Sequence, residues 1–230
     1  MPEFIDHQAK RALFDGFAKV GKAVSSGRRV EILDVLANGE RSVEGLAVQV
    51  GLSVANTSQH LQVLREAGLV SGRREGTSIR YRLASAEVFG FLRALRAIAA
   101  SRLAEVDRLA EAYLGRWDAE AAMTRKELAG RLRRGDDLVV IDVRPEEEYA
   151  AGHLPGALSI PLDELAKRIR GLPKDKEIVA YCRGRYCAYS HVAVDLLRKR
   201  GFRASRLEEG LPEWEAEALP VTRGKTDSGD

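Results

Sequence analysis

The pattern of apolar residues changes near the middle of this 230-residue chain. Up to about residue 115, apolar positions recur at three- and four-residue spacing, which is typical of helices, and one strand-like run at residues 78–83 interrupts them. From about residue 124, helical stretches alternate with short apolar runs at residues 138–143, 177–182 and 202–207. We therefore expect a mainly helical first half and an α/β second half with a parallel sheet flanked by helices.

The length of the chain suits two domains of ordinary size, because domains cluster near about 100–150 residues. We place residues 1–117 in the first domain and residues 118–230 in the second. Hydrophobic residues make up 45% of the chain and charged residues 31%, which favours packed cores over disorder. No apolar run approaches the roughly 20 residues that span a bilayer, and residues 1–10 lack the order of a signal peptide. We expect no membrane partner and a cytoplasmic location.

The first half contains two helical stretches joined at residues 51–53, the short Gly-containing connection of a helix-turn-helix. Ser53 is placed to cap the second stretch, in which Val54, Leu61 and Leu64 are expected to face the core. The polar residues near the start of this second helix can read base edges through their donors and acceptors, and they are Asn56, Thr57, Ser58, Gln59 and His60.

Two strand-like runs around a tip rich in Gly and Arg follow at residues 69–83 and indicate a wing. The basic excess of the chain lies in this half, since residues 1–117 contain 17 Lys and Arg against 13 Asp and Glu, and the remainder contains 20 against 21. Arginines at a wing tip suit phosphate contacts or the minor groove, although a solvated hairpin is the alternative. The arginines predicted to contact DNA are Arg65, Arg73, Arg74 and Arg80.

Residues 29–36, 42–70 and 76–83 resemble the ArsR/SmtB family of winged helix-turn-helix repressors. The resemblance covers about residues 20–115. It implies a homodimeric repressor that binds operator sites in double-stranded DNA, and we expect the operator to be an inverted repeat. It also implies that the first helix and the helix of residues 86–114 form the dimer interface.

The spacing of apolar residues independently predicts one continuous helix over residues 86–114. Such a helix would extend about 43 Å at roughly 1.5 Å per residue, which is more than a small domain covers alone. A partner chain is one plausible cover for its apolar stripe. The stripe comprises Val88, Leu92, Leu95, Ala99, Leu103, Val106, Ala110 and Tyr113.

The sequence predicts no metal site. Where metal-sensing members of the family have cysteines, this chain has Glu40, Arg41 and Ser42, which supply no thiolate. Residues 85–115 contain no histidine, so the acid and histidine pairs of the family's other metal sites are also missing. Isolated histidines, for which a surface or packing role is simpler than metal ligation, are His7, His60 and His191.

The chain has two cysteines, Cys182 and Cys187, in one short stretch. Two cysteines so close in sequence cannot form the disulfide framework of a secreted fold, so reactive chemistry is the simpler interpretation. Cys182 ends a strand and precedes a helix that starts near Ala188, where backbone N–H groups and the helix N-terminus favour a thiolate. Arg183 and Arg185 add positive charge for a thiolate, a persulfide or an anionic donor, unless they simply face solvent. Both cysteines and both arginines form the predicted catalytic set.

Residues 139–165, 181–187 and 207–221 resemble the opening signature, the active loop and the closing segment of rhodanese-like domains. The resemblance covers about residues 124–222. It implies that Cys182 accepts sulfane sulfur as a persulfide from a small donor and passes it to a nucleophilic acceptor such as a thiol. We predict no cofactor for this chemistry.

Cys187 closes the loop at a position where many members of that family have no thiol. It could attack a persulfide on Cys182 and form a disulfide or polysulfide bridge, or it could pack as a small buried residue. Asp142, Arg144 and His153 match family positions for which scaffolding is at least as well supported as catalysis. A phosphatase of this fold would end a longer loop with Arg, so phosphate chemistry and arsenate reduction are minority alternatives.

The leading hypothesis is a DNA-binding repressor in which persulfidation of Cys182, or its crosslinking to Cys187, alters DNA affinity. One alternative is a working sulfurtransferase in which the winged helix has a separate role. Another is a docking module that has kept the rhodanese-like fold without its activity.

Overall fold

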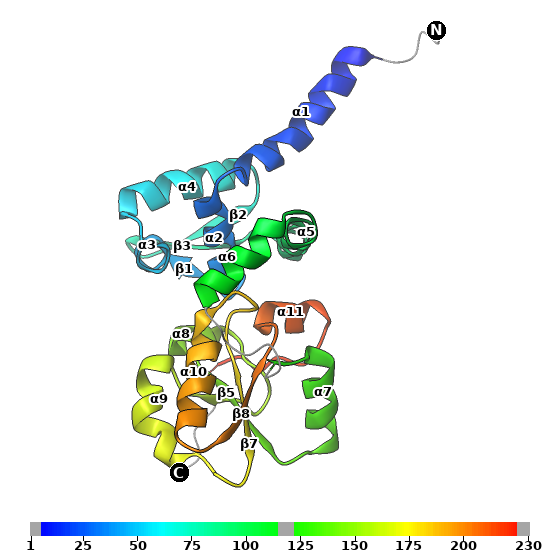
Figure 1. Cartoon of the computed structure of the whole chain (residues 1–230). Coiled ribbons are helices and arrows are strands. Elements are labelled where there is room, and N and C mark those ends of the chain that lie inside the picture. The colour runs from blue at the N-terminus through cyan, green and yellow to red at the C-terminus, as the bar shows by residue number, and fades with distance from the viewer. Residues whose placement is uncertain (1–5, 115–121, 225–230) are drawn as a thin grey trace. The chain divides into compact units, whose positions relative to one another are not determined.

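The computed structural model describes residues 6–114 and 122–224 and divides into two compact units, residues 1–95 and 96–230. Each unit is considered by itself (Figure 1). The domain boundary predicted between residues 117 and 118 lies outside the described residues and stays a prediction. Within the described ranges, no helix is both long and apolar enough to cross a membrane.

The first unit is mainly helical and carries a small antiparallel sheet of order β1-β3-β2. Ser53 caps α4 by accepting a hydrogen bond from the N–H of Asn56, and Gly51 ends α3 in the left-handed conformation, as a tight helix-to-helix turn requires. The predicted winged helix-turn-helix is therefore confirmed. Its elements are α1 (His7–Ala23), α2 (Gly27–Leu36), β1 (Arg41–Ser42), α3 (Val43–Val50), α4 (Val54–Glu66), β2 (Val70–Glu75), β3 (Ser78–Leu83) and the start of α5 (Ala86–Arg102).

The core of this unit orients α4. Leu61 and Leu64 are fully buried against the residues of α2 and α3, as the sequence predicts. The sequence also predicts Val54 in this core, but Val54 is 46% exposed, so that prediction is wrong. Val54 is the first residue of α4, where the helix has not yet reached the core. Burial of one face of α4 leaves its opposite face free.

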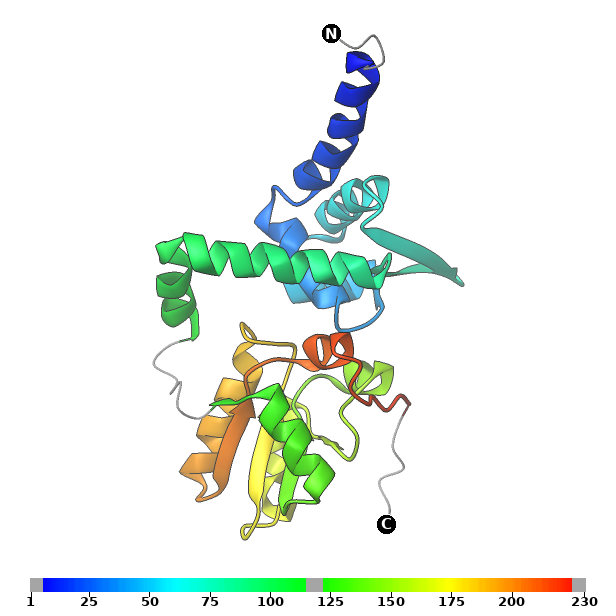
Figure 2. The same cartoon turned by 90° about the vertical axis from the view of Figure 1, so that its right-hand side faces the viewer.

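The helix predicted over residues 86–114 is two helices, α5 (Ala86–Arg102) and α6 (Ala104–Leu114), with a break at Leu103. Figure 2 shows the chain turning between them. The charges around the break suit two helix ends, since Arg102 lies in the last turn of α5 and Glu105 and Asp107 lie in the first turn of α6. Apolar periodicity alone does not reveal this stop, so the prediction of one continuous helix is wrong.

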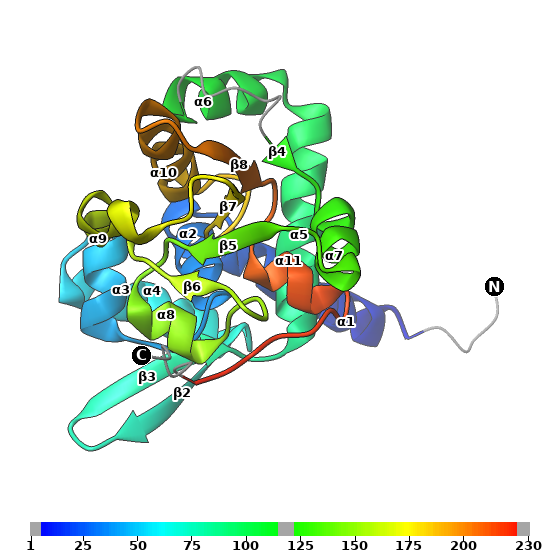
Figure 3. The same ribbon diagram turned by 90° about the horizontal axis from the view of Figure 1, so that it is seen from below.

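The second unit is an α/β fold with a five-stranded parallel sheet of order β4-β8-β7-β5-β6, visible in Figure 3. The predicted parallel sheet flanked by helices is thus confirmed. After α6, its elements are β4 (Ala122–Met123), α7 (Arg125–Arg134), β5 (Leu138–Asp142), α8 (Glu146–Ala151), β6 (Leu158–Ser159), α9 (Leu162–Arg168), the 3₁₀ helix η2 (Ile169–Gly171), β7 (Glu177–Tyr181), α10 (Ala188–Lys199), β8 (Arg203–Leu207) and α11 (Leu211–Ala216).

Two apolar layers cover the two faces of this sheet. One core packs residues of α9 and α10 against Ile178, Ala180 and Ala204. The other packs residues of α7, α8 and α11 against Val179 and Leu207. Because the strands are parallel, the carboxyl ends of β5, β7 and β8 meet at one edge of the sheet, where binding sites of α/β folds commonly lie. Both cysteines are at this edge.

Candidate functional site

A six-residue loop carries the two cysteines between β7 and α10. Cys182 directly follows β7, and Cys187 is the N-cap residue of α10. The N–H of Cys187 donates to the carbonyl oxygen of Gly184 at 3.0 Å, which closes the loop on itself. Gly184 has a φ of +147°, a conformation that L side chains rarely adopt. The loop conformation therefore depends on glycine at this position.

The sulfur of Cys182 is buried and surrounded by polar groups. Only 2% of the residue is exposed, and its Sγ lies 3.5 Å from Ser190 Oγ and 3.5 Å from the carbonyl oxygen of Cys187. Burial opposes ionisation of Cys182, but hydrogen bonds from Cys187 and Ser190 outweigh it and lower the pKa to about 7. Cys182 is consequently a substantial fraction thiolate near neutral pH.

Cys187 has the opposite electrostatic character. Its hydrogen bond to Cys182, together with burial, raises the pKa of the Cys187 thiol well above its usual range. Both thiols are free, with no disulfide between them. The structure thus brings the two predicted thiols together as an unequal pair, in which Cys182 is the more acidic thiol and Cys187 is the protonated hydrogen-bond donor.

Arg183, for which the sequence predicts an anion-binding role, is ion-paired within the second unit. Its guanidinium forms three hydrogen bonds with the fully buried carboxylate of Glu148 on α8, at 2.6–3.0 Å, and lies 5.1 Å from the ring centroid of Tyr189. Glu148 therefore balances the charge of Arg183, and the pair ties the loop to α8. The predicted role of Arg183 in holding an anion stays a prediction. Arg185, by contrast, is exposed, and none of the hydrogen bonds or ion pairs of the described residues involves it.

The closing segment of the unit supports the loop from behind. At Gly210, any Cβ would lie 2.4 Å from the carbonyl carbon and oxygen of Arg183 and 2.7 Å from the N of Gly184, distances that no side chain tolerates. The N–H of Gly210 donates to Glu213 at 3.0 Å, which fixes the start of α11. Glycine at this position lets two backbones approach closely and holds the loop in place.

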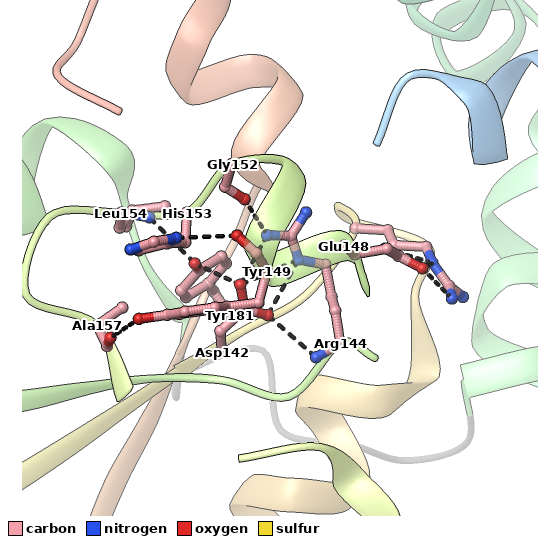
Figure 4. A network of polar contacts seen from close by, with 10 residues as sticks. Asp142, Arg144, Glu148, Tyr149, Gly152, His153, Leu154, Ala157 and Tyr181 are labelled. Atoms are coloured by element: carbon pink, nitrogen blue, oxygen red, sulfur yellow. Dashed lines mark hydrogen bonds and ion pairs between the residues drawn. The ribbon is translucent and has the colours of Figure 1, made fainter. Parts of the chain in front are cut away.

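A buried polar network fixes the strand ends below the loop (Figure 4). The carboxylate of Asp142 accepts hydrogen bonds from the guanidinium of Arg144 and, at 2.6 Å, from the hydroxyl of Tyr181. His153 stacks on Tyr149 with a centroid distance of 3.7 Å and an interplanar angle of 8°. Asp142, Arg144 and His153 are fully buried, in keeping with scaffolding. Because Tyr181 immediately precedes Cys182, this network fixes the backbone from which the Cys182 side chain extends.

The exposed face of α4 presents polar side chains near its N-terminus. Asn56, Ser58 and Gln59 are exposed, and His60 is half-buried. Thr57 is fully buried, and its hydroxyl donates to the carbonyl oxygen of Ser53 at 3.0 Å. The prediction that Thr57 reads bases is therefore wrong. Helical periodicity places Thr57 on the same face as the core residues four and seven positions later.

The wing arginines differ in how freely they can meet a phosphate. Arg73 and Arg80 form ion pairs with Glu75 and Glu40 at 3.3–4.0 Å. Arg65 lies exposed in the last turn of α4, and Arg74 is exposed on β2 with a hydrogen bond to the carbonyl oxygen of Gly76. Ion pairs this exposed contribute about 0–1 kcal/mol, so a DNA phosphate can displace the acidic partner at little cost.

Residues 6–114 and 122–224 contain no group of three or more His, Cys, Asp or Glu side chains placed to hold a metal ion. Arg41 is buried, and Ser42 caps α3 by accepting from the N–H of Gly45. The segment at which metal-sensing ArsR/SmtB proteins carry cysteines is thus used here for folding.

The sequence does not single out three residues that define the loop: Glu148, Ser190 and Gly210. Glu148 is one of three consecutive glutamates, and nothing local tells which of them turns inward. Ser190 could have been found from helical spacing, since it lies in the first turn of a helix that begins beside the thiols. The close approach at Gly210 is a long-range contact, which has no local signal.

Two protein families match this chain. Residues 26–71 match the family described as bacterial regulatory protein, arsR family, and residues 124–217 match the rhodanese-like domain. The chain is 46% identical over 215 residues to the HTH-type transcriptional regulator Rv0324 of Mycobacterium tuberculosis, and the match covers 94% of each chain.

Partial matches cover each half separately. A sulfurtransferase of Allochromatium vinosum is 33% identical over 97 residues, which is 42% of this chain and 89% of that protein. The solution structure of the homodimeric winged helix-turn-helix domain of Mb0332 from Mycobacterium bovis is 42% identical, with a TM-score of 0.41, and covers 46% of this chain and 95% of that one.

A Gly210→Ala substitution is expected to displace the cysteine loop. The added methyl group overlaps the backbone of Arg183 and Gly184, so we expect the unfolding free energy in urea to fall by about 1–3 kcal/mol and alkylation of Cys182 to slow. The matched control is Gly171→Ala, where a Cβ meets nothing within 4 Å. Equal stability and reactivity in the two variants would contradict the close approach.

The rate of Cys182 alkylation by iodoacetamide is expected to rise with pH around a midpoint near 7, because the thiolate is the reacting form and the pKa is lowered to about 7. A Cys187→Ala substitution removes the strongest stabilising hydrogen bond, so the midpoint should move upward toward that of an ordinary thiol. Alkylation that is quenched at set times and followed by peptide mass spectrometry measures the dependence of the rate on pH for both proteins. An unshifted midpoint in Cys187→Ala would refute the pairing of the two thiols.

Proposed function

Because the chain belongs to the arsR family of bacterial HTH-type transcriptional regulators and carries a rhodanese-like domain, we propose that it is a sulfur-responsive repressor. As a dimer it binds double-stranded operator DNA, and sulfane sulfur arriving at Cys182 changes its DNA affinity. The observation that carries this proposal is the pairing of a low-pKa thiol, Cys182, with a protonated thiol, Cys187, in one loop. Operator binding implies a cytoplasmic location.

The first chemical step is capture of sulfur by Cys182. With thiosulfate as donor, the Cys182 thiolate attacks the outer sulfur, a new S–S bond forms, and the S–S bond of the donor breaks as sulfite leaves. Charge is conserved, because the product persulfide carries one negative charge and sulfite carries two. The hydrogen bonds that hold the thiolate, including that from Ser190, are placed to hold a persulfide at the same position.

The second step closes a bridge and releases the captured sulfur. The Cys187 thiol attacks the Cys182 sulfur of the persulfide, a disulfide forms, and the outer sulfur leaves as hydrosulfide with the proton of Cys187. The two thiols are oxidised and the sulfane sulfur is reduced, so no further oxidant is needed. Once the negative charge moves to the outer sulfur, Cys187 no longer shares its proton with a thiolate at Cys182, and the main cause of its raised pKa is removed.

The DNA-binding half of the proposal rests on α4 and the wing. The exposed polar face of α4 offers Asn56, Ser58 and Gln59, with the half-buried His60 beside them, to base edges in the major groove. The wing arginines then supply phosphate or minor-groove contacts. These roles follow from exposure and charge, because a helix whose core face is buried can turn its other face to DNA.

Dimerisation is proposed through α1, α5 and α6. Apart from Ala23 at its end, α1 buries no residue, and Figure 1 shows it extending away from α2 and α4. Apolar side chains on a helix without a cover in its own chain favour a second copy as the cover. The exposed apolar residues of these helices and of the break between α5 and α6 are Leu13, Phe14, Phe17, Ile98, Leu103, Leu109 and Tyr113.

A second candidate function is enzymatic sulfur transfer. The pKa of Cys182 near 7 favours it, because the thiolate is the attacking species in sulfane-sulfur capture. In this alternative the persulfide passes to an external thiol faster than Cys187 can resolve it. Steady turnover with thiosulfate and a thiol acceptor would favour the enzyme over the switch.

The proposed switch predicts that sulfur loading changes DNA affinity through both thiols. An operator fragment is first selected from random-sequence DNA by the reduced protein, and its binding is measured by fluorescence anisotropy before and after treatment with thiosulfate or an organic persulfide. We expect at least about a fivefold change in Kd, the lower range of allosteric coupling. Intact-mass analysis in parallel reports whether the protein carries a persulfide or a disulfide.

Two variants identify the thiol responsible. Cys182→Ser should neither gain sulfur nor change its DNA affinity. Cys187→Ala should gain one sulfur atom but stay at the persulfide, so it separates the effect of the persulfide from that of the bridge. Unchanged operator affinity in the wild-type protein with both thiols converted would eliminate the switch.

The wing should bind phosphates rather than provide sequence specificity. Replacing Arg74 by Ala is expected to weaken binding to all DNA sequences and to reduce the slope of log Kd against log salt by about 1 for each phosphate that the variant no longer binds. Arg200→Ala, an exposed arginine at the end of α10, is the control with the same charge change. A salt slope that is equal in the two variants would remove Arg74 from the DNA interface.

A further inference from the structure

Arg206 is a charged residue inside the second unit that the sulfur chemistry described above does not use. It lies on β8, which pairs in parallel with β7, and its register partner is Ala180. Cys182 follows Ala180 by two residues, just past the end of β7. Strands are roughly 4.8 Å apart and rise about 3.3 Å per residue, so the long Arg206 side chain starts within reach of the Cys182 sulfur.

The side chain of Arg206 is on the same face of the sheet as Cys182. Side chains alternate between the two faces of a strand, so Arg206 shares a face with Ala204. Ala180, Cys182 and Ala204 belong to one core, which α9 and α10 cover. Arg206 therefore lies between β8 and α10, on the cysteine side.

The surroundings of Arg206 lack an acceptor for one of its donors. Its Nε is buried and has no hydrogen-bond partner among the described residues, while the residue as a whole is half-buried. A buried donor without an acceptor destabilises the folded protein, so an anion at this place would be stabilising. Burial lowers the pKa of Arg206, and attraction to Glu208 and to the Cys182 sulfur opposes that effect. The guanidinium stays charged at neutral pH.

Two other basic side chains near the loop, His191 and Arg183, are uncharged or already ion-paired. Burial and the positive charge of Arg206 lower the pKa of His191 on α10 to about 4, so this imidazole is uncharged at pH 7. Arg183 is neutralised by Glu148. The positive charge of the exposed Arg185 is close enough to Arg206 to repel it and to lower the pKa of Arg206 slightly.

We propose that Arg206 is a specificity-determining residue that, together with Arg185, attracts anionic reagents to Cys182 and so selects anionic sulfane-sulfur donors over neutral ones. The electrostatic part depends on the charge of Arg206 alone, whereas the donor preference rests on the proposed sulfur-accepting function. A cation near a partly desolvated thiolate favours an incoming anion, because Coulomb attraction is screened less there than in bulk water. Thiosulfate, with two negative charges, is the donor chemistry that benefits most.

The test compares two alkylating reagents of nearly equal size, iodoacetate and iodoacetamide, on the full chain. In both reactions the thiolate bonds to the methylene carbon and iodide leaves, so the reagents differ only in charge. Trypsin cleaves after Arg183 and Arg185 and thus separates the two cysteines, which lets mass spectrometry follow Cys182 by itself. The measured quantity is the ratio of the iodoacetate rate to the iodoacetamide rate at a pH where Cys182 is ionised.

We expect Arg206→Met to lower this ratio roughly tenfold and Arg206→Lys to keep most of it, since lysine retains the charge. The matched control is Arg203→Met on the same strand, because Arg203 lies on the opposite face and donates to the carbonyl oxygen of Asp175. Melting temperatures of all variants verify folding. A ratio that is unchanged in Arg206→Met would overturn the proposal.

A second experiment, with an anionic and a neutral sulfur donor, distinguishes a failure of this inference from a failure of the proposed function. Wild-type protein and Arg206→Met are each treated with thiosulfate or with a neutral organic trisulfide, and the sulfur adduct on Cys182 is quantified by mass spectrometry. Thiosulfate gives a persulfide as sulfite leaves, and attack on the central sulfur of the trisulfide gives a mixed trisulfide as one thiolate leaves. A selective loss of thiosulfate reactivity in Arg206→Met supports the donor preference, and equal losses with both donors overturn it. If neither donor loads wild-type Cys182 while the alkylation ratio still depends on Arg206, the sulfur-accepting function fails and the electrostatic role of Arg206 stands.

Discussion

The sulfur of Cys182 is a potential anion in a buried position, and the geometry around it follows from that constraint. Burial disfavours a thiolate, so the loop must present hydrogen-bond donors in fixed directions. Several contacts hold those donors: the pairing of Arg183 with Glu148, the close backbone approach at Gly210, and the hydroxyl of Tyr181 on Asp142. None of these groups needs to react, yet each restricts where a donor can lie. The acidity of Cys182 therefore depends on the contacts that hold the loop as much as on the thiol itself.

The two units differ in which polar groups their packing exposes and which it buries. In the first unit, packing of Leu61 and Leu64 decides which face of α4 is exposed, and the polar residues on that face need no partner within the chain. In the second unit, the parallel strands bring a strand end, a loop and a helix start to one edge. The first unit thus leaves a polar helix face exposed, whereas the second unit encloses a thiol.

Sequence patterns predict the architecture and the proximity of the two thiols better than the contacts of the charged residues. The winged helix, the parallel sheet and the thiol pair follow from periodicity and from motifs, which are local. Charge next to a cysteine suggests anion binding by Arg183, but its partner Glu148 is distant in sequence. Thr57 shows the same limit on a smaller scale, since being near the start of α4 does not reveal which way it faces. Arg206 becomes visible only when strand register places it beside Cys182.

The close approach at Gly210 has a consequence for the timing of biosynthesis. The ribosome makes the two cysteines more than twenty residues before it makes the glycine that supports their loop, and Arg206 also comes later. Until that closing segment has emerged and packed, the donors around Cys182 are not held in place, and the thiol keeps the low acidity of an unfolded chain. The thiolate fraction of Cys182 at neutral pH should therefore rise as the domain is completed, because the lowered pKa depends on the packed loop.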